Sequence, residues 1–226
     1  MYLIFEGLMC AFVAGLIAVF QNDSALWTIL LKTAASLCFV LAGFCGYIRN
    51  KGKRTISQTM LTAFICSMAG DVLLALDADQ GILFVLGVAS FAAAHVLFSL
   101  SFCRVSAVTK KDIAGTITLF AALLCLLFLG NFDFQGLLPV LTGYAAVISF
   151  MTVKALSLWR CRRERKQAAA LTMLGGTLFL LSDIVLLFWL FGIGVPKEVQ
   201  SVNWVLYYLA QGCLAAAVNQ KIRSHE

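Results

Sequence analysis

Eight long apolar runs, separated by short polar breaks, constrain the fold of this chain more than any other feature of its sequence. The runs occupy approximately residues 2–20, 26–48, 56–76, 82–103, 113–130, 137–159, 168–191 and 200–222. A helix needs about 20 apolar residues to cross the hydrocarbon core of a bilayer. With 62% hydrophobic and only 12% charged residues, the chain does not have the composition of a soluble domain. We therefore predict an all-α, multi-pass protein of the cell membrane, in which residues 1–226 form a single domain of eight transmembrane helices.

The breaks between the runs alternate strictly in charge. Lysine and arginine gather in the 49–54, 104–112 and 160–166 breaks and in the C-terminal tail, whereas the 21–25, 77–81, 131–136 and 192–199 breaks together hold one lysine. Cytoplasmic loops of membrane proteins carry such an excess of positive charge, so we expect both termini to be cytoplasmic. These loops explain the net charge of +6 without a nucleic-acid partner. The predicted partner is the lipid bilayer, and the oligomeric state is left open.

Four ionisable residues fall well inside the apolar runs, namely Lys32, Asp71, His95 and Asp183. A charged side chain at the centre of a bilayer costs about 2.5–3.5 kcal/mol on insertion scales, so such residues are functional by default. Their depths within the runs, together with that of Gln211, allow one shared polar pocket that opens toward the outer leaflet. The sequence gives these depths but not the directions in which the side chains point.

Three other polar residues have local interpretations. Ser67 lies one helical turn before Asp71, and we expect it to hydrogen-bond the carboxyl group. Glu6 and Lys154 lie near the inner ends of their runs, where a long side chain can extend its charged group to the interface. We therefore expect both to be interfacial.

Short matching segments place the two aspartates in corresponding positions of the two halves of the chain. Each half carries one aspartate segment and, further along, an aromatic residue four positions before a polar one. The segments are Gly70-Asp71-Val72-Leu73-Leu74 with Ser182-Asp183-Ile184-Val185-Leu186, and Phe91-x-x-x-His95 with Tyr207-x-x-x-Gln211. A four-plus-four tandem repeat would give both halves the same orientation in the membrane. Asp71 and Asp183 would then be equivalent residues that face each other across one central cavity.

The same segments, taken in order, resemble a known family. The motifs are Ser67-Met68-Ala69-Gly70-Asp71, Phe91-x-x-x-His95-x-x-Phe98, Gly176-x-x-x-x-x-Ser182-Asp183 and Tyr207-x-x-x-Gln211. Their order, spacing and eight-run setting are similar to those of the YhhN-like lysoplasmalogenase family over essentially the whole chain. Two positions depart from the family pattern, which often has Lys-Pro where this chain has Lys32-Thr33, and Tyr where it has Phe98.

The resemblance implies an enzyme that hydrolyses the vinyl ether bond of lysoplasmalogens. The products are a fatty aldehyde and glycerophosphoethanolamine or glycerophosphocholine, and the implied partner is therefore a lysophospholipid substrate. By the same resemblance, Asp71 and Asp183 are the candidate catalytic residues.

Two buried carboxyl groups suit this chemistry. Hydrolysis begins with protonation of an alkene carbon, which forms an oxocarbenium ion that water captures. One protonated carboxyl group can supply the proton, and an ionised partner can stabilise the cation and activate the water, as paired carboxylates do in glycoside hydrolysis. The sequence leaves open which aspartate is the acid.

The other polar residues are candidates for substrate binding or water orientation. Lys32 can hold the substrate phosphate or pair with the ionised aspartate, and its position toward the interface, where head groups lie, favours the phosphate. His95 and Gln211 can orient water. Ser67 and Tyr207 complete this set of candidates.

Other classes of function are compatible with intramembrane acids. A proton-coupled transporter often has paired repeats and acids at the midplane, but its helices are commonly broken by Pro or Gly at the site, and this chain has two prolines, both near run ends. A purely structural or non-catalytic lipid-binding role is another alternative. A zinc hydrolase would need three protein ligands, and the chain has two histidines and no CxxC pair among eight cysteines. We expect no metal and no other cofactor.

Overall fold

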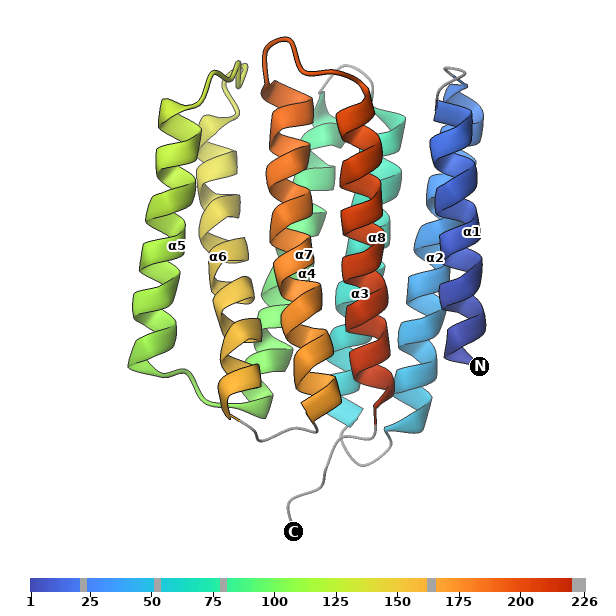
Figure 1. Ribbon diagram of the computed structural model, residues 1–226, viewed down its shortest axis with the longest axis vertical. Coiled ribbons are helices and arrows are strands. Elements are labelled where there is room, and N and C mark those ends of the chain that lie inside the picture. The colour runs from blue at the N-terminus through green and yellow to red at the C-terminus, as the bar shows by residue number, and fades with distance from the viewer. Residues whose placement is uncertain (21–23, 51–53, 78–80, 162–165, 221–226) are drawn as a thin grey trace.

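The computed structural model describes residues 1–20, 24–50, 54–77, 81–161 and 166–220, and these residues form eight α-helices joined by short connections (Figure 1). Each helix is long and apolar enough to cross a membrane, which confirms the prediction of an all-helical, multi-pass protein. The helices are α1 (Tyr2–Phe20), α2 (Ala25–Arg49), α3 (Arg54–Leu76), α4 (Ile82–Val105), α5 (Lys110–Leu129), α6 (Leu138–Cys161), α7 (Lys166–Phe191) and α8 (Glu198–Asn219).

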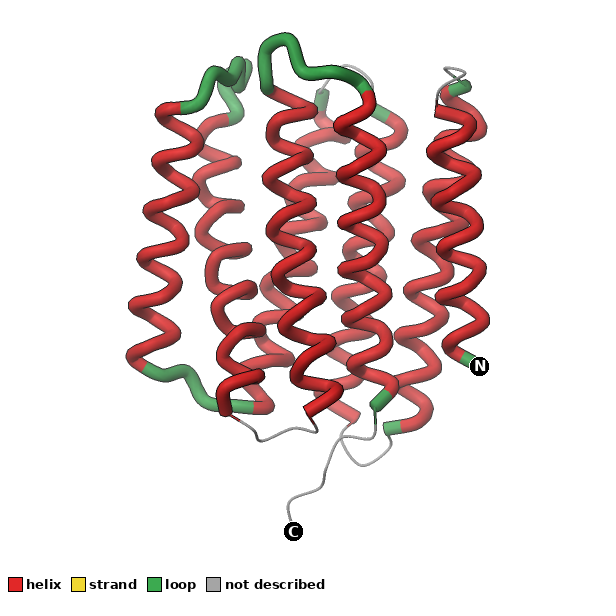
Figure 2. Tube along the Cα trace, in the orientation of Figure 1, coloured by secondary structure: helices red, strands yellow, loops and turns green. Residues whose placement is uncertain are grey.

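Six of these helices form a ring. In the order of their contacts they are α2, α3, α4, α6, α7 and α8, and α8 closes the ring by packing on α2. The remaining two helices lie outside the ring on opposite sides of the bundle (Figures 1 and 2). Helix α1 packs against α2 and α8, and α5 packs against α6. The polar residues that the sequence places within the apolar runs therefore come from helices that face one another across the ring.

The contacts of the first four helices recur in the last four. The pairs α1–α2, α2–α3 and α3–α4 correspond to α5–α6, α6–α7 and α7–α8, and the contact of α2 with α8 corresponds to that of α6 with α4. One contact breaks the correspondence, because α1 also packs on α8 whereas α5 has no comparable contact with α4 within the described residues. This arrangement is the one expected for a four-plus-four repeat, which itself stays a prediction.

Large aromatic side chains fill the centre of the ring, and small residues let the helices approach. The aromatic side chains that are almost fully buried are Phe39, Phe64, Phe98 and Phe179. A Cβ atom added at Gly43 would lie 2.5 Å from the Phe64 ring, and one added at Gly176 would lie 2.7 Å from the Cβ of Ala155. Small residues at such crossings replace the hydrophobic driving force that lipid does not provide between helices.

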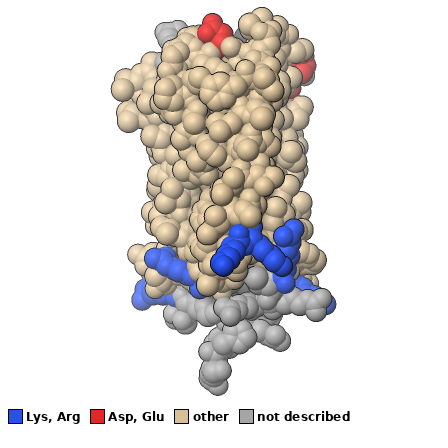
Figure 3. Space-filling view, turned by 90° about the vertical axis from the view of Figure 1, so that its left-hand side faces the viewer, with Lys and Arg blue, Asp and Glu red and all other residues tan. Residues whose placement is uncertain are grey.

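Charge separates along the bundle axis. Lysine and arginine cluster at one end of the molecule, and the acidic side chains in the same view lie at the other end (Figure 3). We call these the basic end, which carries the 104–112 connection, and the acidic end, which carries the 131–136 connection. Parts of the other basic segments, residues 51–53, 162–165 and 221–226, lie outside the described residues. The basic end is the one that the loop charges predict to be cytoplasmic.

The expectation that Lys154 extends to the interface is wrong. Its side chain is fully buried, and its Nζ lies 3.0 Å from Asp112 Oδ2 and donates to the carbonyl oxygen of Ala107 at 2.8 Å. Asp112 belongs to the first turn of α5, where it forms a capping box with Thr109. A buried cation is tolerated only with such a partner, so this ion pair joins the start of α5 to α6. Glu6 is also not fully exposed, because its Oε1 is buried without a hydrogen-bond partner among the described residues.

Candidate active site

A cavity of about 230 Å³ lies inside the ring, and both Asp71 and Asp183 line it. Lys32 and Tyr207 also line this polar cavity, and it extends toward the acidic end as far as Gln200 in the first turns of α8. The structure thus brings the two intramembrane acids, which are four helices apart in the chain, to one space. The other residues that line it are Leu74, Asp77, Phe84, Phe91, Ser182, Leu186, Trp189, Leu190, Asn203 and Trp204.

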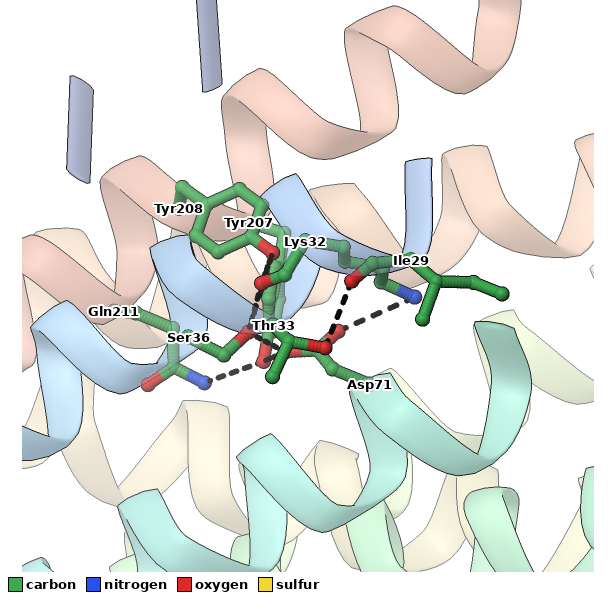
Figure 4. Close-up of polar contacts among 8 residues, drawn as sticks. All are labelled: Ile29, Lys32, Thr33, Ser36, Asp71, Tyr207, Tyr208 and Gln211. Carbon is green, nitrogen blue, oxygen red and sulfur yellow. Dashed lines mark hydrogen bonds and ion pairs between the residues drawn. The ribbon is translucent and has the colours of Figure 1, made fainter. Parts of the chain in front are cut away.

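Asp71 is held by three groups from two helices (Figure 4). Lys32 Nζ lies 3.4 Å from Oδ1, and the hydroxyl groups of Ser36 and Tyr207 donate to Oδ2 at 2.6 and 2.7 Å. Asp71 is only 2% exposed, so its carboxyl group depends on these partners rather than on water. Burial by itself disfavours the charged form of this carboxyl group. The three partners act in the opposite direction, because a carboxylate accepts hydrogen bonds and a lysine ammonium is a cation.

A second layer of polar groups orients the partners of Asp71. Gln211 donates from Nε2 to the Tyr207 hydroxyl at 3.2 Å, and the Tyr208 hydroxyl donates to the Lys32 carbonyl at 3.1 Å and lies 3.2 Å from Ser36 Oγ (Figure 4). The local sequence explains this arrangement. Residues four apart lie on one face of a helix, so α2 presents Lys32 with Ser36 and α8 presents Tyr207 with Gln211.

Asp183 is held by a different set. The Tyr144 hydroxyl donates to Asp183 Oδ2 at 2.7 Å, and His95 Nε2 lies 2.7 Å from that hydroxyl and 3.3 Å from the same carboxylate oxygen. His95 is fully buried against the Phe179 ring, whereas the Asp183 side chain is 13% exposed. With Tyr144 donating to Asp183, the Nε2–H of His95 donates to Tyr144. No lysine or arginine in the described part of the chain forms an ion pair with Asp183.

The structure assigns the predicted site residues to two layers and corrects one contact. Lys32, Asp71, Asp183 and Tyr207 line the polar cavity, whereas His95 and Gln211 do not. Gln211 reaches Asp71 through Tyr207, and His95 contacts both Tyr144 and the Asp183 carboxylate. The expected hydrogen bond between Ser67 and Asp71 is wrong.

Ser67 Oγ is buried and finds no partner among the described residues. The serine that bonds Asp71 is Ser36 on the neighbouring helix. One turn of spacing places Ser67 on the same side of α3 as Asp71, but the carboxyl group points across to α2 and α8.

Sequence reasoning missed Ser36, Tyr144 and Tyr208. Two of them carried a usable signal. Ser36 lies one turn after Lys32, and Tyr144 follows Lys32 by the same 112 residues that separate Asp183 from Asp71. The predicted repeat, applied at this spacing, would have pointed to Tyr144 as the counterpart of Lys32. Tyr208 had no such signal, because it lies beside Tyr207 in an apolar run.

A second cavity, of about 90 Å³, adjoins the polar one and is apolar. It lies among α4, α5, α6 and α7, and the only residues with polar side-chain groups among its lining are Tyr144 and Asp183. The two cavities share six lining residues, which are Leu74, Phe84, Phe91, Asp183, Leu186 and Leu190. Asp183 thus stands where a polar space meets an apolar one.

No group of three or more His, Cys, Asp or Glu side chains within the described residues is arranged to hold a metal ion. The cysteines whose side chains are described are free thiols distributed over the helices. The polar groups of the site are thus two carboxyl groups, a lysine, and the hydroxyl, amide and imidazole groups that orient them.

Comparison with known proteins gives one match. The model of the YhhN family matches residues 27–218, from α2 to α8. This range includes Asp71, Asp183 and all the side chains described above as their partners. No curated protein and no solved structure matches the chain.

Proposed function

The chain belongs to the YhhN family, which includes lysoplasmalogenases, and from this premise we propose that it hydrolyses the vinyl ether bond of lysoplasmalogens. The products are a fatty aldehyde and a glycerophospho head group. The observation that carries the proposal is the pair of carboxyl groups on one cavity with unlike partners. Asp71 lies against a cation and two hydroxyl groups, and Asp183 against a tyrosine and a histidine.

The unlike partners support a division of roles. Asp71 serves as the ionised carboxylate, because Lys32, Ser36 and Tyr207 stabilise its negative charge. Asp183 serves as the general acid, because it borders the apolar cavity and its one short hydrogen bond comes from a neutral phenol. A carboxylic acid that works beside an ionised carboxylate is the arrangement that acid–base pairs use elsewhere.

The reaction proceeds in three steps with these roles. Asp183 transfers its proton to the alkene carbon away from the ether oxygen, and the resulting oxocarbenium ion is stabilised by the negative charge of Asp71. Water attacks the cationic carbon and gives up a proton to Asp71. The hemiacetal then collapses to an aldehyde and an alcohol. Asp71 returns its proton to the departing oxygen while Asp183 takes the proton of the hemiacetal hydroxyl group, so that both carboxyl groups regain their starting states and the net change is the addition of one water molecule.

Lys32 contributes by keeping Asp71 ionised. The sequence allowed either this role or a contact with the substrate phosphate, and the 3.4 Å distance to Asp71 Oδ1 favours the first. His95 and Gln211 act as positioning residues through Tyr144 and Tyr207 respectively.

The experiment is the incubation of purified protein with a lysoplasmalogen beside its ester and alkyl ether analogues. We expect aldehyde release from the vinyl ether alone, because only that bond forms an oxocarbenium ion on protonation of carbon. Fatty acid release from the ester would redirect the assignment to a lysophospholipase. No turnover of any of the three by folded protein would contradict the proposal.

A further inference from the structure

We propose that the apolar cavity among α4, α5, α6 and α7 binds the hydrocarbon chain of a single-chain lipid whose glycerophospho head group occupies the polar cavity. The bond at the head end of the chain then lies at Asp183. The inference rests on the proposed function for the identity of the substrate, and it adds where each part of that substrate binds.

The continuity of the two cavities carries the inference. Their six shared lining residues form one boundary, and the apolar cavity reaches Tyr144 and Asp183 at that boundary. Beyond it, leucine, isoleucine, valine, alanine and phenylalanine side chains line the apolar cavity, with Leu127, Ala145 and Ile148 all buried. A ligand that fills both spaces must be polar at one end and hydrocarbon at the other.

The size of the apolar cavity indicates that it holds only the start of a chain. A water-sized group needs roughly 10–15 Å³ of such volume, so about 90 Å³ accommodates a short segment of carbons. At the acidic end aromatic rings leave little room for a chain, with Phe191 packed against Phe84 and Phe134 at centroid distances of 6.2 and 5.6 Å. The rest of the chain must therefore leave sideways.

The helix packing differs between the two halves at the position where such a sideways route would lie. In the first half α1 packs on both α2 and α8, whereas in the second half α5 packs on α6 without a comparable contact to α4 within the described residues. The seam between α4 and α5 is thus the place where a chain can pass from the cavity to the surrounding lipid. The same route allows a lipid substrate to enter from the bilayer.

Photolabelling tests this placement without depending on catalysis. The probe is an alkyl ether lysophospholipid with a diazirine a few carbons from the head group, because an alkyl ether is not hydrolysed by the proposed chemistry. We expect irradiation of the purified protein in nanodiscs to label residues 123–127 and 141–148, and a tenfold excess of the same lipid without diazirine to remove most of the label. Competable label on α1, α2 or α8 instead, or label that excess lipid does not reduce, would overturn the inference.

A matched pair of variants sharpens the test. Ala145→Phe puts a ring into the apolar cavity, whereas Ala122→Phe puts the same ring on an exposed position of α5 that does not line it. We expect the first to lose at least about tenfold of the competable label and the second to keep it. Should Ala145→Phe fail to fold, Leu127→Phe fills the same cavity from α5. Undiminished competable label in a folded cavity-filling variant contradicts the placement.

The labelling experiment and the turnover assay can each reject one proposal without rejecting the other. Competable label at 123–127 and 141–148 in a protein that releases no aldehyde would retain the lipid site and reject the hydrolase. Aldehyde release with competable label elsewhere would retain the hydrolase and reject this orientation of its substrate.

Discussion

The surroundings of Asp71 and Asp183 have the same arrangement of helices but differ in the side chains that contact each carboxyl group. Each aspartate lies on the third helix of its half and is contacted by the second helix of its own half and the fourth helix of the other half. At corresponding positions the second helices carry Lys32 and Tyr144, a cation in one case and a phenol in the other. The two carboxyl groups thus differ in the charge of the side chain at this corresponding position, and this difference supports the proposed division into base and acid.

The fourth helices of the two halves differ in which side chain contacts the aspartate. On α8 the tyrosine touches the aspartate and Gln211 lies behind it, whereas on α4 the corresponding aromatic residue is Phe91 and the polar partner is His95. Phe91 lies so close to α3 that a Cβ added at Gly70 would be 2.7 Å from its ring. The Asp71 side of the cavity is consequently richer in hydroxyl groups, and the Asp183 side is more apolar.

The largest expected effect comes from removing either carboxyl group. Asp71→Asn and Asp183→Asn should each lower kcat by at least about a hundredfold, the scale of lost general acid–base assistance. The double variant should be little worse than either single one, since the two groups act as a unit. Steady-state kinetics on folded protein measure this.

Stability distinguishes this outcome from a purely structural pair. Asp183→Asn should leave the thermal midpoint close to that of the parent, because no cation is left unpaired by the change. A structural role would instead give poor folding with normal turnover in the surviving protein. Parental turnover in either folded Asn variant would show that the two-carboxylate mechanism is wrong.

Lys32→Met is expected to have the next largest effect, because it removes the cation that distinguishes the surroundings of Asp71 from those of Asp183. Without the ammonium, Asp71 is less readily ionised, so kcat should fall roughly tenfold to a hundredfold and its pH profile should change while KM stays constant. Measurement of kcat and KM across pH tests this. A raised KM with unchanged kcat would show that Lys32 holds the substrate phosphate.

Tyr144→Phe and Tyr207→Phe compare the two hydroxyl groups directly. A hydrogen bond to a charged group contributes about 1.5–3 kcal/mol, more than one to a neutral group. If Asp71 is the ionised partner, Tyr207→Phe should cost about tenfold or more in kcat and Tyr144→Phe less than that. Tyr208→Phe is the control, because that hydroxyl donates to a backbone carbonyl instead of an aspartate. The reverse order of effects would exchange the assigned roles of acid and base.

The smallest expected effect on turnover concerns the ion pair at the basic end. Lys154→Met should destabilise the protein by about 3–5 kcal/mol, because it leaves Asp112 buried without its cation. Adding Asp112→Asn should restore most of that loss. Lys154 lies about 15 Å from Tyr144 along α6 at 1.5 Å per residue, so turnover per folded molecule should not change. A matching loss of kcat in the double variant would mean that the two ends of α6 are coupled.

The sequence predicted the eight helices well, for a physical reason. The cost of exposing a backbone to lipid forces continuous helices, and each predicted run ends within three residues of the observed helix. The paired aspartates could be found because intramembrane charges are rare.

The directions in which the side chains point across the bundle could not be predicted from the sequence. These helices are apolar on every side, so their sequences carry little information about which face meets a neighbour. Ser67 therefore seemed the partner of Asp71, although Ser36 fills that role. Lys154 was misplaced for a related reason, since its partner Asp112 lies in a segment whose other charges are basic.

The position of Asp183 between the polar and the apolar cavity has a consequence for inhibition of turnover by accumulated products. In the proposed reaction, scission at this point divides a lysoplasmalogen into a water-soluble half in the polar cavity, which extends toward the acidic end, and an oily half in the apolar cavity beside the seam between α4 and α5. Each product can depart by its own route without passing the carboxyl groups. Accumulated aldehyde in the bilayer and accumulated glycerophosphodiester in solution should therefore inhibit separately, each at its own exit.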